Sequence, residues 1–193
     1  MNKNKGKLII FSAPSGSGKT TLVKHLMKNI DNLSFSISAT SRKMRGNEID
    51  RKDYYFLTAD EFRKKIGNEE FVEWEEVYDD KYYGTLKSEV ERIITTGQNV
   101  VFDVDVVGGV NIKKLYGNNA LAIFVMPPSI EVLKKRLQSR GTDNESDIKS
   151  RIDKAEYELT FADKFDKVII NDNLEKAQIE TVDAVKEFIG SYF

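Results

Sequence analysis

A glycine-rich turn near the N-terminus constrains the fold of this chain more than any other sequence feature. Residues 12–21 read SAPSGSGKTT, follow the apolar run 8–11 and precede a segment of helical periodicity. A strand, such a turn and a helix form the setting that a phosphate-binding loop requires. Backbone N–H groups and the helix N-terminus bind phosphate there, Lys19 reaches the β- and γ-phosphates, and the Thr20 hydroxyl holds Mg²⁺. The predicted loop residues are Ala13, Pro14, Ser15, Gly16, Ser17, Gly18, Lys19, Thr20 and Thr21.

One position departs from the usual phosphate-loop pattern. Ala13 stands where the first glycine is normally found, and we expect this turn position to tolerate a methyl group. Gly16 and Gly18 bracket the approach of the backbone to phosphate, where a side chain would interfere. The alternative interpretation is an ordinary Ser/Gly-rich turn between a strand and a helix.

Composition narrows the classes of protein further. The chain has 193 residues, no cysteine and one histidine, so we expect no disulfides, thiolate catalysis or Cys- or His-based metal cluster. Thirty Lys and Arg residues balance 31 Asp and Glu residues, which argues against a protein that coats nucleic acid. The apolar runs are too short for a membrane span or a signal peptide. We therefore expect a cytoplasmic protein without a nucleic-acid or membrane partner.

The alternation of short apolar runs with helical segments predicts an α/β fold. Strands are expected at residues 8–11, 33–37, 100–102, 121–125 and 168–170, and helices at 18–29, 86–96, 107–116, 130–140, 146–162 and 174–189. This order is typical of a parallel sheet flanked by helices. Thr85 is expected to cap the helix at 86–96.

Two segments interrupt this alternation. Residues 38–84 are polar and aromatic, and predict a small inserted lobe of short strands around one helix, with Thr58 and Glu61 as its capping box. Residues 140–150 are rich in turn and cap residues, which is typical of a mobile lid between two helices. We predict a single domain with a core at about 1–37, 85–138 and 163–193, the lobe at about 38–84 and the lid at about 139–162.

Two acids follow the strand expected at residues 100–102. Asp103 ends that strand, and Asp105 comes two positions later on the same side of an extended chain. A carboxylate at the C-terminal edge of a parallel sheet is well placed beside the Mg²⁺ of a bound nucleotide, so Asp103 joins Thr20 as a predicted metal-binding residue. The alternative is an Asp that caps the following helix.

Further motifs follow the phosphate loop in order. They are FSISATSRKMR at 35–45, DYYF at 53–56, EFVEW at 70–74, YYGT at 82–85, DVD at 103–105, and KKRLQSRGT at 134–142 followed by Arg151. With these motifs the sequence resembles the guanylate kinase family along nearly its whole length. The resemblance implies a P-loop NTPase fold with a parallel sheet flanked by helices, a mixed α/β lobe that binds GMP, and a helical lid.

The resemblance also implies a GMP site. The predicted GMP-binding residues are Arg42, Arg45, Tyr54 and Tyr83 for the phosphate, Ser38, Glu73, Thr85 and Asp105 for guanine, and Asp103 in the same site. Arginines suit a dianion, and a carboxylate can accept from N1–H and N2–H₂ of guanine together. The alternatives are a solvated basic turn for the arginines, a charged solvent face around Glu73 and core packing for the tyrosines. Core packing is the interpretation we keep for Trp74.

Arginines around the predicted lid resemble those that clamp a transferring phosphate. Arg136, Arg140 and Arg151 therefore join Lys19 as the predicted catalytic residues, with surface ion pairing as the alternative. Asn171 is predicted to touch the adenine of ATP, and an Asx turn explains it equally well.

The implied reaction transfers the γ-phosphoryl group of ATP to GMP and dGMP, with Mg²⁺ as cofactor, in purine nucleotide metabolism and GMP recycling. The acceptor phosphate is already ionised, so no Ser, Cys or His nucleophile is needed. A non-catalytic interaction module of the same fold and a kinase of another phosphorylated metabolite stay as alternatives, and monomer or homo-oligomer is left open. Three departures from the family pattern, at Val107, at residues 78–81 and at residues 45–48, leave local loop geometry open.

Overall fold

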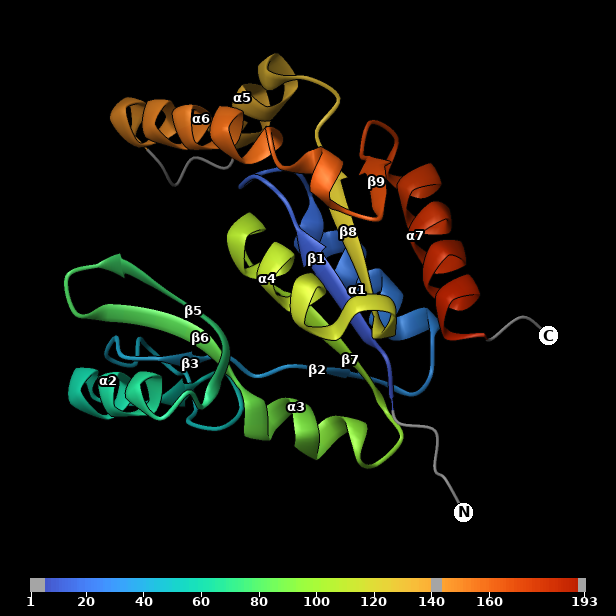
Figure 1. Cartoon of the computed structure of the whole chain (residues 1–193). Coiled ribbons are helices and arrows are strands. Elements are labelled where there is room, and N and C mark those ends of the chain that lie inside the picture. The colour runs from blue at the N-terminus through green and yellow to red at the C-terminus, as the bar shows by residue number, and fades with distance from the viewer. Residues whose placement is uncertain (1–5, 140–143, 191–193) are drawn as a thin grey trace.

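The computed structural model describes residues 6–139 and 144–190, and its larger sheet forms the core of the molecule (Figure 1). This core sheet contains β2 (Leu33–Phe35), β7 (Asn99–Asp103), β1 (Leu8–Ser12), β8 (Ala120–Met126) and β9 (Lys167–Ile170), in that spatial order and all parallel. β1 is central and buried along its whole length, as its unbroken apolar sequence requires. The predicted parallel sheet is confirmed.

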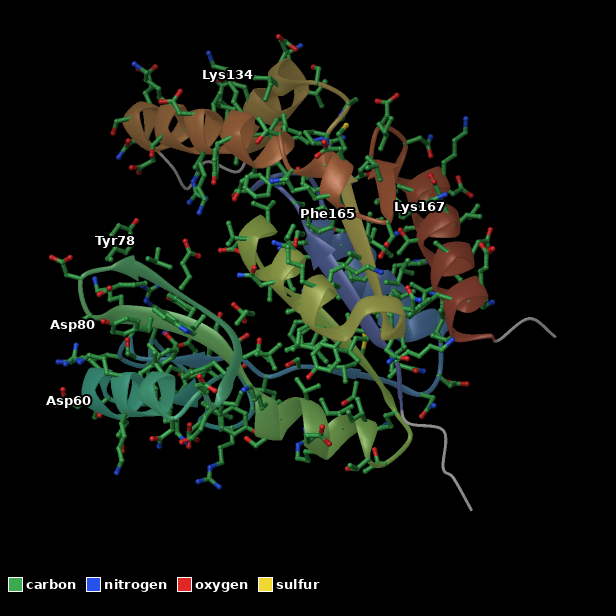
Figure 2. The ribbon with its side chains drawn as sticks, in the orientation of Figure 1. Asp60, Tyr78, Asp80, Lys134, Phe165 and Lys167 are labelled. Atoms are coloured by element: carbon green, nitrogen blue, oxygen red, sulfur yellow. The ribbon has the colours of Figure 1, made fainter. Side chains whose placement is uncertain are left out.

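Helices cover both faces of the core sheet. Alternate residues of β1 point to opposite faces, so Ile9 and Phe11 pack against α1 (Lys19–Asn29) and α7 (Leu174–Ile189). Leu8 and Ile10 pack with α3 (Lys87–Ile94) and α4 (Val106–Tyr116) on the other face. Phe165, labelled in Figure 2, closes this second cluster and follows the short 3₁₀ turn Ala162–Lys164. A second 3₁₀ turn, Gly117–Asn119, connects α4 to β8.

The inserted lobe forms a sheet of its own. Its strands are β3 (Ala39–Thr40), β4 (Tyr55–Phe56), β5 (Phe71–Tyr78) and β6 (Lys81–Leu86), in the order β4-β3-β6-β5. Tyr78 and Asp80 lie at the tip of the β5–β6 hairpin (Figure 2), and Asp80 has a φ of 59°, so the departure at residues 78–81 is accommodated in this turn.

The helix of the lobe begins at the predicted capping box. In α2 (Ala59–Gly67), Thr58 Oγ1 accepts from the Glu61 N–H at 3.1 Å, and Glu61 Oε2 accepts from the Thr58 N–H at 2.7 Å. Phe62 of this helix is fully buried and stacks on Phe71 of β5, with ring centroids 4.3 Å apart. The local sequence thus places both the start of the helix and its contact with the lobe sheet.

A helix pair lies at one end of the core sheet (Figure 1). α5 (Ile130–Ser139) begins where Ser129 Oγ accepts from the Val132 N–H, and α6 (Glu145–Leu159) packs against it through a small apolar cluster that includes Leu137 and Ala155. Helix α6 lies within the predicted lid at about 139–162, α5 lies almost wholly in the predicted core, and Arg140 lies outside the described residues. Among the described residues no helix combines the length and the apolar character that crossing a membrane needs.

Two expectations about individual residues are wrong. Thr85 belongs to β6, and Leu86, which has no side-chain cap, precedes α3. The Thr85 hydroxyl is instead turned across the sheet towards Glu73. Trp74 is 47% exposed, and its ring contacts that of the buried Tyr82 only at the edge of the lobe cluster, with centroids 6.3 Å apart, so it is not a core residue.

Candidate functional site

The phosphate loop joins β1 to α1 at the carboxyl edge of the core sheet. Gly16 and Gly18 have φ values of 96° and 93°, a region in which side chains are disfavoured. Ala13 is buried and is not among the described residues with positive φ, which explains why a methyl group is tolerated there. The backbone conformation therefore favours glycine at positions 16 and 18, where the sequence has it.

Asn171 braces this loop from the end of β9. Its Nδ2 donates to the carbonyl oxygen of Ser17 at 2.7 Å, and the side chain is buried. A Cβ on Gly18 would come within 2.2 Å of the same Nδ2 atom. Asn171 was predicted to touch adenine or to form an Asx turn, and neither prediction described its hydrogen bond to Ser17. On the other side of the loop, Asn171 and Arg136 line a groove, and Arg136 Nη2 donates to the Asn171 carbonyl at 2.8 Å.

Removing this brace is expected to destabilise the loop. Asn171→Ala leaves the buried Ser17 carbonyl without its donor, which costs about 1 to 3 kcal/mol of unfolding free energy. Asn171→Asp keeps the shape but removes the N–H₂ donor, so it should lose a similar amount. Calorimetric unfolding without nucleotide measures both. A wild-type melting temperature in the two variants would contradict this role.

A cavity of about 480 Å³ lies in front of the loop. Its charged lining residues are Lys19 of the loop, Asp103 at the end of β7, Asp105 just after β7, and Arg151, Lys154 and Glu158 of α6. Lys19 Nζ forms an ion pair with Asp103 and donates to the Val104 carbonyl at 3.2 Å. Arg151 Nη1 donates to Ser15 Oγ at 2.9 Å, so α6 contacts the phosphate loop directly.

The donors around this cavity fit a metal ion carried by a nucleotide. Thr20 and Asp103 both line it and offer the oxygen ligands that Mg²⁺ prefers. Within residues 6–139 and 144–190, no cluster of three or more His, Cys, Asp and Glu residues could hold a metal by itself.

On the lobe, a buried arginine faces two phenol rings. The Arg42 guanidinium lies 4.8 Å from the ring centroid of Tyr54, whose ring is 6.2 Å from that of Tyr83. Arg42 also forms a bidentate pair with Glu48, at 2.7 and 2.6 Å, and Glu48 accepts from the Arg45 N–H at 2.8 Å. The bond from Arg42 lowers the pKa of Glu48 to about 2. Sequence reasoning missed Glu48, although it stands within the stretch 45–48 that departs from the family pattern.

A carboxyl pair lies between the lobe and the core. Thr85 Oγ1 donates to Glu73 Oε1 at 2.7 Å, from neighbouring strands β6 and β5. A Cβ on Gly108 of α4 would lie 3.0 Å from Glu73 Oε2 and 3.2 Å from Asp105 Oδ1, so both carboxyl groups approach the same glycine. Asp105 Oδ1 accepts from the Gly108 N–H at 2.6 Å and caps α4, whereas Asp103, for which a helix cap was the alternative, pairs with Lys19.

Burial changes the acidity of this pair. Burial is the main cause that raises the pKa of Glu73 to about 7, and the nearby charge of Asp105 adds to the rise. The hydrogen bond from Thr85 opposes it. Glu73 can therefore exchange a proton near neutral pH, which makes it sensitive to a ligand that donates hydrogen bonds to it.

The structure brings most of the predicted residues into two groups that meet at Asp105, and it leaves Arg136 and Asn171 in the groove on the other side of the loop. Loop residues other than the buried Ser17 lie with Asp103, Asp105 and Arg151 around the cavity, whereas the lobe carries Ser38, Arg42, Arg45, Tyr54, Glu73, Tyr83 and Thr85. Ser38 contributes its backbone carbonyl to Tyr55, and its side chain is half-buried. Val107 is exposed on the first turn of α4.

Two lining residues, Lys154 and Glu158, were missed by sequence reasoning. They follow Arg151 by three and seven positions, which places all three on one helical face. That spacing was a readable signal, because Arg151 was already a predicted site residue. Which face of α6 meets the cavity became clear only from its packing against α5.

Comparisons with known proteins agree with one another. The family model described as guanylate kinase matches residues 5–192. A guanylate kinase of Bacteroides thetaiotaomicron is 62% identical over 185 residues, covering 96% of this chain and 91% of the relative. A guanylate kinase of Porphyromonas gingivalis is 57% identical over 185 residues, covering 95% and 98%. The crystal structure of guanylate kinase from Anaplasma phagocytophilum aligns with a TM-score of 0.73 at 25% identity, covering 96% of this chain and 87% of that one.

Proposed function

The chain belongs to the guanylate kinase family, and from this premise we propose how its residues phosphorylate GMP with ATP. The reaction gives ADP and GDP. The observation that best supports the assignment of residues is the place of Asp105, which lines the phosphate-loop cavity and also approaches Gly108 beside Glu73. A donor bound on the loop and an acceptor bound on the lobe would therefore meet at this residue.

On the donor side, the loop binds the phosphates of ATP. The backbone N–H groups of the loop, which Pro14 lacks, and the N-terminus of α1 supply partial positive charge, and Lys19 neutralises charge on the transferring group. Mg²⁺ held by Thr20 and Asp103 would add charge neutralisation between the phosphates. Asp103 also keeps Lys19 at the cavity wall through their ion pair.

On the acceptor side, the lobe binds GMP. Arg42, Arg45, Tyr54 and Tyr83 take the phosphate, and Ser38, Glu73, Thr85 and Asp105 take guanine. The predicted contacts are to the base and the phosphate of GMP. Because dGMP differs from GMP only in the sugar, dGMP is expected to be a substrate as well. Because an ionised phosphate oxygen is the nucleophile, alignment of two repelling anions is the main task of the site.

The helical lid completes the site. Arg136, Arg140 and Arg151 stabilise charge on the transferring phosphate, and closure of the region at about 139–162 over the core excludes water. Water would otherwise compete with GMP as the acceptor. We propose that a single domain contains the core, the GMP-binding lobe and the helical lid.

A coupled assay of ADP formation tests this function. With ATP and Mg²⁺, GMP and dGMP should be turned over, while AMP, UMP and dTMP should be very poor acceptors. IMP should lose about one to two orders of magnitude in kcat/KM, because it lacks only the 2-amino group. Turnover of AMP as fast as GMP would reject the assignment of the lobe as a guanine site.

The raised pKa of Glu73 predicts a pH dependence of GMP binding. Guanine donates N1–H and N2–H₂, so it binds the ionised carboxylate and not the protonated acid. As pH falls below about 7, the KM for GMP should rise by about tenfold per pH unit, and it should level off above that value. The dependence should disappear in Glu73→Gln. It should persist in Glu75→Gln, because Glu75 is not a predicted guanine contact, although a hydrogen bond with Asp105 and burial raise its pKa to about 7 as well. Steady-state kinetics across this range measure it, and a flat KM in the wild type would contradict it.

A further inference from the structure

We propose that Lys154 of α6 binds a phosphate group of the bound substrates, in addition to Lys19 and the predicted arginines. This inference rests on the proposed function and adds a phosphate-binding residue to that site. It is supported by the position of Lys154 in the cavity, by the charges around it and by the accessibility of its ammonium group.

Lys154 lies on the face of α6 that lines the phosphate-loop cavity. Arg151, Lys154 and Glu158 are spaced three and four apart, and all three line this cavity together with Lys19. The buried Ala155 on the adjoining part of the helix packs against α5, which holds α6 in this rotation. The Lys154 side chain is therefore directed towards the place where ATP phosphates are proposed to bind.

Charge in the cavity favours a cation at this position. The charged lining residues are three cations, Lys19, Arg151 and Lys154, and three carboxyl groups, Asp103, Asp105 and Glu158. Without Lys154 the lining would hold two cations against three acids, a poor environment for a polyphosphate. Lys154 therefore offsets the acids that the cavity carries.

The Lys154 ammonium is available for a ligand. Its Nζ lies 3.8 Å from Glu158 Oε1, too far for a hydrogen bond, and the side chain is 59% exposed. Lys19, by contrast, is held against Asp103 and Val104. An ammonium carries three donors, and phosphate oxygens are better acceptors for them than a carboxylate at this distance.

The field of Lys154 extends to the point where the lobe meets the core. A hydrogen bond with Asp105 and burial raise the pKa of Glu75 to about 7, and the positive charge of Lys154 opposes that rise. Lys154 also lines the same cavity as Asp105, the residue at which donor and acceptor are proposed to meet. A phosphate bound by Lys154 would be close to the transferring group.

Three variants test this inference in the full-length chain. Lys154→Met removes the charge and keeps the aliphatic stem, Lys154→Arg keeps the charge, and Lys149→Met removes a cation of the same helix that lines a different groove. Initial rates are measured with ATP varied at saturating GMP and Mg²⁺. We expect kcat/KM for ATP to fall about 10- to 100-fold in Lys154→Met and to stay within about threefold of wild type in the other two.

A double variant separates phosphate binding from simple neutralisation of acids. If Lys154 only offsets the charge of Glu158, which lies 3.8 Å from it in the cavity lining, then Glu158→Gln should restore activity to Lys154→Met. If it binds phosphate, the loss should persist in Lys154→Met/Glu158→Gln when compared with Glu158→Gln alone. Restoration, or a wild-type kcat/KM in Lys154→Met, would overturn the inference. Thermal unfolding of each variant checks that the chain is folded, and an inactive wild type would reject the proposed function itself.

Discussion

Replacing Lys19 with alanine is expected to lower kcat by about 10³-fold or more while GMP still binds. A phosphate-loop lysine stabilises charge that develops as the phosphoryl group moves, so its loss falls mainly on the transition state. In the structure its ammonium lies at the cavity wall, paired with Asp103 and the Val104 carbonyl.

Single-turnover kinetics and GMP titration by calorimetry check this expectation. Lys24→Ala is the matched control, because Lys24 is an exposed cation of the same helix α1 outside the cavity. The GMP affinity of Lys19→Ala should stay near that of the wild type, since GMP is proposed to bind on the lobe. Near-normal turnover in Lys19→Ala would reject the assignment of the phosphate loop.

Replacing Glu73 with glutamine is expected to lower kcat/KM for GMP by about 10²-fold and to narrow the preference for GMP over IMP. The ionised carboxyl group can accept from both N1–H and N2–H₂, and bonds to an ionised partner contribute about 1.5 to 3 kcal/mol each. Glutamine presents one oxygen and one N–H₂ group. Since Thr85 already donates to Oε1, the remaining position facing guanine would then carry a donor.

The measurement is kcat/KM for GMP and IMP in both enzymes. Glu76→Gln serves as the control, because Glu76 is exposed and lies on the opposite face of β5. An unchanged ratio of GMP to IMP in Glu73→Gln would mean that Glu73 does not read the 2-amino group. Glu73 would then belong to the charged solvent face that its glutamate neighbours form.

Much of the fold was predictable because its signals are local. The phosphate loop, the apolar strand before it and the capping box of α2 each depend on residues within a few positions of one another. Parallel strands buried on both faces have continuous apolar sequences, so the core strands were predicted within a few residues of their observed bounds. The family resemblance added the candidate residues on the lobe, and their roles stay predictions until the variants are measured.

Other features were decided by contacts between distant segments. Thr85 reads locally as a helix cap, but pairing of β5 with β6 places it opposite Glu73. Trp74 lies on the other face of β5, where it stays 47% exposed. Asn171 gained its role only when the end of β9 came next to the phosphate loop. A local sequence pattern predicts which residues share one face of a helix or strand. It does not predict which other element will pack against that face.

The sequence by itself determined the phosphate loop, the parallel α/β core and the inserted lobe, because backbone preference and apolar periodicity act over short stretches of chain. The tertiary structure alone decided that Glu73 and Asp105 approach Gly108 together and that Lys154 lines the cavity of Lys19. The charge of a side chain does not determine which way the side chain points. That direction depends on the rotation of its helix or the register of its strand, and packing sets both. For this protein, that packing turns scattered charged residues into one site for two anionic substrates.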